Sequence, residues 1–223
     1  MTQLRIHDDF TRHIIVTPDD YQWVPSPMPG VERMMLDRIG DEVARATTIV
    51  RYRANSEFSP HMHGGGEEFF VLEGVFSDEF GDYPVGTYVR NPIGTSHRPK
   101  VGPEGATIFV KLHQFAADDK IQKVIHTTSN TWREGSVSGL RVQPLHEHKG
   151  ERTLLIDASP NTQVDEHQHH GGEEIYVLNG TLYDEWGTYP KGTWIRYPRM
   201  SKHTPYTKED GTTILVKTGH LPA

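Results

Sequence analysis

Short apolar segments rich in β-branched and aromatic residues alternate with turn-forming clusters along the chain. In the first half these segments are TTIVRYR (47–53), EEFFVLEGVF (67–76), GTYVRNP (86–92) and ATIFVKLHQF (106–115). Between them lie GDYPVG, NPIGTS and GPEG, whose glycine, proline and asparagine residues favour tight turns. No segment keeps a helical period over a useful length. The pattern predicts an all-β protein, either a sandwich or a barrel.

The segment EEFFVLEG is apolar at nearly every position after its glutamates. An alternating pattern would indicate a strand with one wet face, whereas a continuous run indicates burial on both faces. We therefore expect this strand to line a barrel on one side and to meet a second sheet on the other.

An internal repeat determines the domain organisation. Residues 61–99 align without a gap on residues 167–205, at an offset of 167 − 61 = 106, and 20 of the 39 aligned residues are identical. The same offset places ATIFVKL (106–112) on TTILVKT (212–218). The sequence therefore predicts two copies of one domain, residues 1–116 and residues 117–223, joined within the polar segment 115–130.

Net charge, apolar run length and the absence of cysteine limit the classes of function and of metal site that the chain can have. The 223 residues carry a net charge of −7, which argues against a nucleic-acid surface, because such a surface needs a basic face. No apolar run reaches the roughly 18 residues of a membrane helix, and the N-terminus lacks the apolar core of a signal peptide, so we expect a cytoplasmic protein. Cysteine is absent, so any metal must be held by nitrogen and oxygen atoms.

The first copy contains a cluster with the spacing of metal ligands. His61 and His63 alternate, and on a strand alternate side chains point to the same side. Glu67 begins the next predicted strand after a glycine-rich bend, and His97 follows a short loop. Imidazole and carboxylate suit zinc, iron, manganese, cobalt or nickel.

The second copy repeats all four residues at the same spacing as His167, His169, Glu173 and His203. Surface or core histidines are the alternative interpretation for either copy alone. Neighbouring residues change between the copies, for example Met62 to Gln168, while all four candidates are kept. We therefore predict one divalent metal ion in each copy, bound by three histidines and one glutamate.

We expect structural roles for the other polar residues that recur in both copies. Glu68 and Glu174 alternate away from the ligand face, so we expect them to accept structural hydrogen bonds. Arg90 and Arg196 are expected in structural ion pairs, with anchoring of an anionic ligand as the alternative. Asp78-Glu79 and its repeat lie at predicted hairpins, where acidic residues are ordinary. The pair His146-x-His148 has no counterpart in the first copy and is expected to be exposed.

These motifs resemble those of the cupin superfamily. The first cupin motif corresponds to His61, His63, Glu67 and Gly74, and the second to Gly86, Pro92, Gly94 and His97. The usual trailing asparagine of the second motif is absent from both copies, and Met200 replaces its loop glycine in the second copy. The resemblance implies a bicupin, with two tandem jelly-roll barrels. The hairpin pattern DE-x-G-x-Y-P-x-G-T resembles, more narrowly, the cupin module of ChrR-type anti-sigma factors.

The narrower resemblance implies a metal-dependent sensory or regulatory protein of the oxidative-stress response, with zinc as the first choice of metal and iron, manganese or nickel as alternatives. Those anti-sigma factors hold the sigma factor through a separate helical domain with a cysteine-containing zinc site. This chain has no cysteine and no space for that domain, so sigma binding is not implied. Resemblance to bicupins also implies a homodimer.

Coordination number separates the functional hypotheses. Four protein ligands close a tetrahedral zinc site, which makes it structural or sensory. The same four around an octahedral metal leave two positions for a substrate or dioxygen. The sensory protein, whose partner would be a small molecule or another protein, is the first hypothesis. The alternative is a dioxygenase that cleaves a small diketone- or hydroxyketone-like substrate, and a purely structural metal is a third.

Overall fold

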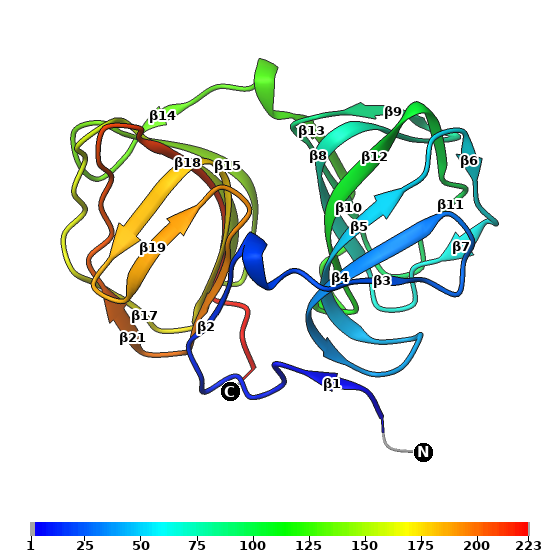
Figure 1. Ribbon diagram of the computed structural model, residues 1–223, viewed down its shortest axis with the longest axis horizontal. Coiled ribbons are helices and arrows are strands. Elements are labelled where there is room, and N and C mark those ends of the chain that lie inside the picture. The colour runs from blue at the N-terminus through cyan, green and yellow to red at the C-terminus, as the bar shows by residue number, and fades with distance from the viewer. Residues whose placement is uncertain (1–2, 223) are drawn as a thin grey trace. The chain divides into compact units, whose positions relative to one another are not determined.

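A computed structural model describes residues 3–222 as an almost entirely β-stranded chain. Its only helices within these residues are two single 3-10 turns, η1 (Pro18–Asp20) and η2 (Thr127–Ser129). No helix in the same range is long and apolar enough to cross a membrane. The predicted all-β class is confirmed. In each of two compact units the strands curl around an interior to form a barrel (Figure 1).

The first unit contains an antiparallel sheet of ten strands and a small two-stranded sheet. The main path of the large sheet runs β1 (Arg5–Ile6), β4 (Val31–Ile39), β5 (Arg45–Tyr52), β12 (Lys100–Leu112), β8 (Glu67–Asp78), β10 (Thr87–Asn91) and β13 (Lys123–His126). Three short strands join it at the side: β3 (Trp23–Pro25), β6 (Ser56–Glu57) and β9 (Gly81–Pro84). The small sheet pairs β7 (His61–Met62) with β11 (Ser96–His97).

The second unit repeats this plan with an eight-stranded sheet. Its path runs β14 (Arg133–Glu134), β15 (Leu140–His148), β16 (Glu151–Ala158), β22 (Thr212–Thr218), β18 (Glu173–Asp184), β20 (Trp194–Tyr197) and β2 (Ile14–Val16), with β19 (Gly187–Pro190) beside β18. Here the small sheet pairs β17 (His167–His169) with β21 (Ser201–His203).

Strand β8 bears out the expectation of burial on both faces. Its first five residues, Glu67 to Val71, are all buried. Phe69 and Val71 belong to the apolar core of the first barrel. Strand β18 shows the same pattern over Glu173 to Val177. The continuous apolar run in the sequence therefore corresponds to a central strand that is buried on both faces.

The compact units differ from the two linear repeats at two segments. One unit comprises the chain up to Asp8 together with Gln22–Asn130, and the other comprises Asp9–Tyr21 together with the chain from Thr131 onward. The cause is strand pairing: β2, at the start of the first repeat, pairs with β20 of the second barrel, and β13, at the start of the second repeat, pairs with β10 of the first barrel. Each repeat thus supplies one strand to the barrel of the other.

This strand exchange predicts that a residue near the N-terminus stabilises the second barrel. Val16, on β2, is 4% exposed, whereas its neighbour Ile15 is 38% exposed. We expect Val16→Asp to lower the free energy of unfolding by roughly 3 kcal/mol, because it buries an unpaired charge. Ile15→Asp is the matched control and should cost about 1 kcal/mol or less. Equal losses in chemical denaturation would contradict the pairing.

Candidate metal centres

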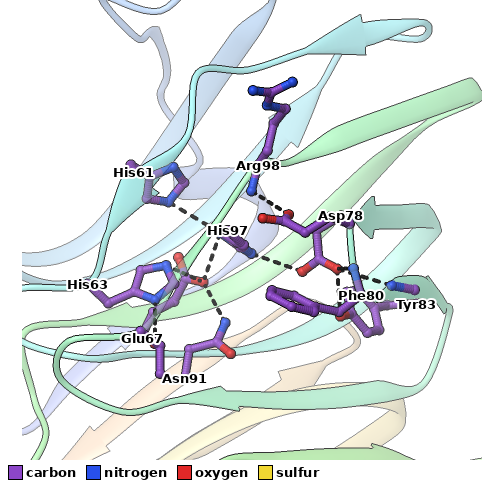
Figure 2. A network of polar contacts seen from close by, with 12 residues as sticks. His61, His63, Glu67, Asp78, Phe80, Tyr83, Asn91, His97 and Arg98 are labelled. Carbon is purple, nitrogen blue, oxygen red and sulfur yellow. Dashed lines mark hydrogen bonds and ion pairs between the residues drawn. The ribbon is translucent and has the colours of Figure 1, made fainter.

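The four predicted ligands of the first barrel converge at one end of its interior. His61 and His97 face each other across the β7–β11 pair, with 3.2 Å between their Nε2 atoms. Glu67 Oε1 lies 3.5 Å from His63 Nε2 and 3.6 Å from His97 Nε2. One donor atom from each of the four residues lies within 4.8 Å of all the others. Figure 2 shows the three imidazoles and the carboxylate pointing toward one another.

The second barrel brings its own four predicted residues together. Donor nitrogens of His167, His169 and His203 lie within 4.8 Å of one another. Glu173 Oε2 lies 3.3 Å from His169 Nε2 and 3.5 Å from His203 Nε2. His167 and His203 are directly opposed across the β17–β21 pair. We call these two sets the first cluster and the second cluster.

A tight bend between the ligand strands makes this convergence feasible. Gly66 has φ +77°, and a Cβ there would lie 2.3 Å from the ring of Phe115. Its counterpart Gly172 has φ +75°, and a Cβ there would lie 2.4 Å from Leu221. Only glycine adopts this backbone conformation without strain, and only glycine fits the space. The glycine run therefore places the glutamate at the start of β8 or β18 opposite the histidine pair.

Buried polar atoms in both clusters lack hydrogen-bond partners. Among the described residues these include Nε2 of His63, His169 and His203, and Oε2 of Glu173. Unpartnered buried polar atoms are rare and need an explanation. His63 Nε2 faces Glu67 in the first cluster, and the other three atoms face one another in the second cluster. A cation bound to them would satisfy them, so the donor set fits a divalent metal with nitrogen and oxygen preference.

Titration behaviour agrees with this fit. Burial, together with a smaller effect of the neighbouring histidines, lowers the pKa of His63 and of His169 to about 3. Neutral imidazole is the form that binds a metal. Burial raises the pKa of Glu67 and of Glu173 to about 7. A carboxylate is costly at these positions without a cation beside it.

Hydrogen bonds on the far side of the rings hold the imidazoles in the ligating tautomer. His97 Nδ1 donates to Asp78 Oδ2 at 3.1 Å, which leaves Nε2 facing the first cluster. The Thr95 hydroxyl donates to the Pro92 carbonyl, so it accepts from His63 Nδ1 at 2.9 Å. In the second cluster His203 Nδ1 contacts Asp184 Oδ2 at 3.3 Å, and His167 Nδ1 donates to the Asp165 carbonyl at 2.9 Å.

Asp78 and Asp184 each contact a predicted ligand histidine, a role that the sequence did not predict. They were expected to be ordinary hairpin residues, but Asp78 is 5% exposed and Asp184 is 6% exposed. Burial alone would raise the pKa of Asp184, yet hydrogen bonds from His203, Tyr189 and Tyr197 lower it to about 2. Their recurrence at the 106-residue offset, each followed by a Tyr five positions later, was the available signal.

The exchanged segments reach the surroundings of the clusters. Gln122, just before β13, donates to Asn91 at 3.3 Å, and Asn91 donates to Glu67 at 3.3 Å. In the second barrel Tyr197 replaces Asn91 and donates to Asp184 instead, at 2.5 Å. His13, just before β2, stacks on Tyr197 with ring centroids 4.6 Å apart.

The structure also shows the contacts of the other polar residues singled out in the sequence. Glu68 and Arg90 form the predicted structural ion pair at 2.9 Å, and Asp119 also binds Arg90. Glu174 accepts a hydrogen bond from His220 at 2.7 Å. The exposed position predicted for His146 is wrong: strand β15 buries it to 3% exposure, because a register shift between Pro144 and His146 changes the alternation of the strand.

A cavity of about 830 Å³ opens beside the second cluster. All four residues of that cluster line it. Aliphatic residues of strands β15, β16, β18 and β22 form one part of the remaining wall: Val142, Leu154, Ile156, Ile175, Leu182, Ile214 and Val216. Polar residues, among them Thr162, Asp165, Tyr206 and Thr207, form another part. Small-molecule sites typically measure about 300–1,000 Å³ and combine apolar walls with a few polar groups. The second cluster therefore has space beside it for an organic molecule.

Comparisons with known proteins agree with this architecture. Several solved structures share the fold at low sequence identity. A candidate dioxygenase from Nostoc punctiforme PCC 73102 is 16% identical, with a TM-score of 0.78 over 95% of this chain and 84% of that chain. Oxalate decarboxylase from Lactobacillus farciminis, in complex with formate, is 11% identical, with a TM-score of 0.66 over 94% and 87%. Oxalate decarboxylase from Bacillus subtilis is 13% identical, with a TM-score of 0.64 over 94% and 77%.

No curated protein matches the sequence. The family described as the ChrR Cupin-like domain matches residues 11–116 and again residues 120–222. Together these segments include both clusters and nearly the whole chain, and the fold of the solved neighbours agrees with them. The chain therefore belongs to the ChrR cupin-like family and contains two copies of its domain.

Proposed function

We propose that the protein is a metal-dependent dioxygenase that cleaves a carbon–carbon bond in a small diketone- or hydroxyketone-like molecule. The observation that carries this proposal is the second cluster, whose unpartnered donor atoms lie at the wall of the 830 Å³ cavity. A site that only stabilised the fold would need no such space. A divalent metal held there supplies a Lewis acid for substrate oxygens.

The protein's own residues have defined parts in this proposal. His167, His169, Glu173 and His203 would hold the metal, and Asp184 orients His203. The aliphatic part of the cavity wall would contact the apolar part of the reacting molecule. Cleavage of a hydroxyketone by dioxygen gives two carboxylic acids, so both oxygen atoms enter the products and no external reductant is needed.

Metal content is the first test. The chain should bind two equivalents of iron or zinc, one in each cluster. His63→Ala and His169→Ala should each reduce this to one equivalent, because each removes a buried ligand. His170→Ala is the matched control, since this exposed residue adjoins His169 and should leave two equivalents. Mass spectrometry or elemental analysis measures the result, and full metal content in either ligand variant would contradict the assignment.

Oxygen consumption is the second test. The iron-loaded protein should consume one molecule of dioxygen for each molecule of substrate from a panel of diketones and hydroxyketones. We expect His169→Ala to lower the rate by roughly 100-fold or more, because it removes a metal ligand. An oxygen electrode together with product analysis gives the stoichiometry. The proposal is excluded if the iron-loaded protein consumes no oxygen with all of the diketones and hydroxyketones in the panel.

A sensory function is the second candidate, and the match to the ChrR cupin-like family favours it. Without cysteine, an oxidant could act only on the metal, histidine or methionine. A sensor loaded with zinc should lose metal or shift its melting temperature after peroxide treatment, while consuming no substrate. Unchanged metal content and melting temperature would exclude it.

A further inference from the structure

We infer that the two barrels have different tasks: only the second binds an organic ligand, an aryl ketone with its oxygens at the second cluster and its ring in the cavity. In the first barrel the protein's own aromatic side chains fill the corresponding space, so its metal serves stability. This inference rests on the proposed function, because it names the substrate class and the barrel that receives it.

Four aromatic residues fill the interior of the first barrel. Tyr52 lies 5.2 Å from Phe58 and 5.3 Å from Phe76, and Phe69 lies 5.0 Å from Phe76, measured between ring centroids. Phe58, Phe69 and Phe76 are buried in the core, and Tyr52 packs against it. Edge-to-face contacts at these distances form a continuous packed group.

This aromatic group extends to the first cluster. The ring centroid of Phe76 lies 6.0 Å from that of His97. Phe76 packs in turn against Tyr52 and Phe69, so the aromatic group is continuous with the ring of this predicted ligand.

The equivalent residues of the second barrel are smaller and aliphatic. Strand register fixes the equivalence: Tyr52 pairs with Ala106 in the first barrel, and Ala158 pairs with Thr212 in the second, at the same 106-residue offset. The four aromatic positions 52, 58, 69 and 76 become Ala158, Val164, Ile175 and Leu182. All four replacements line the 830 Å³ cavity. The cavity thus takes the place of the aromatic group.

The chemistry of the walls defines the ligand. Aliphatic side chains give no hydrogen bonds, so the body of a ligand must be apolar to be buried there. Among the polar residues of the wall, the hydroxyls of Thr207 and Thr212 already donate to main-chain carbonyls. Ligand oxygens would therefore meet the metal at the second cluster. Charged side chains lie at the rim, where Arg152 contacts Glu147 at 3.4 Å and Glu166 contacts Lys202 at 3.1 Å. An uncharged ketone with an aromatic ring meets both requirements, because a ring of the same kind fills the first barrel.

Exchange of side chains between the barrels tests the inference. The probe is benzoylacetone, titrated by calorimetry into zinc-loaded protein, so that no turnover is required. Wild-type protein should bind one equivalent per chain. Leu182→Phe and Ala158→Tyr place first-barrel side chains in the cavity and should weaken binding by at least about 10-fold, because they occupy the space of the ligand. Phe76→Leu and Tyr52→Ala, in the first barrel, are the matched controls. They should leave the affinity of the second barrel for benzoylacetone unchanged.

Metal content and melting temperature are measured on every variant. If Ala158→Tyr loses the second metal through misfolding, the smaller change Leu182→Phe decides the outcome. The inference would be overturned if the wild type bound two equivalents of benzoylacetone. It would also be overturned if a folded Leu182→Phe variant bound benzoylacetone with unchanged affinity. Binding that follows the predicted pattern without oxygen consumption would reject the dioxygenase proposal alone. Oxygen consumption unaffected by Leu182→Phe would reject the division of tasks alone.

Discussion

Burial of a glutamate among three histidines is the constraint that both barrels share. Burial raises the pKa of Glu67 and Glu173 and lowers that of His63 and His169, so the folded chain carries a cost at each cluster. A divalent cation bound at each cluster would remove this cost, because it would satisfy the converging atoms together. The glycine bends, the paired short strands and the buried aspartates all serve to hold these atoms in place.

Duplication of this arrangement allowed the two interiors to diverge while the donor sets stayed the same. Rings fill one interior, and aliphatic residues leave the other hollow. Exchange of the opening strands makes each barrel contain residues of both repeats, because β13 pairs in the first barrel and β2 in the second. Residues beside those strands, Gln122 and His13, also reach the surroundings of the clusters. The two barrels therefore have the same set of candidate ligands but differ in the free space beside them.

Local patterns in the sequence were sufficient for the all-β class, the repeat and the convergence of the eight candidate ligands. Alternation along a strand and an ungapped offset are local properties, and they place His61 beside His63 directly. The roles of Asp78 and Asp184 depend on which hairpin folds over which histidine, which is a long-range contact. The burial of His146 follows from a register shift, and the strand exchange from pairing between distant segments. Predicting the cavity would require knowing which side chains face each other across the strands. That information comes from the strand register, which the sequence alone did not provide.

We propose that both clusters hold a metal and that only the second receives a ligand. X-ray diffraction from crystals of the iron-loaded protein, soaked with benzoylacetone under anaerobic conditions, tests both parts of this proposal in one experiment. We expect an anomalous peak at each cluster, ligand density in the second barrel alone, and the aromatic rings of Tyr52 and Phe76 unmoved in the first. Ligand density in the first barrel, or an anomalous peak missing from either cluster, would contradict this proposal.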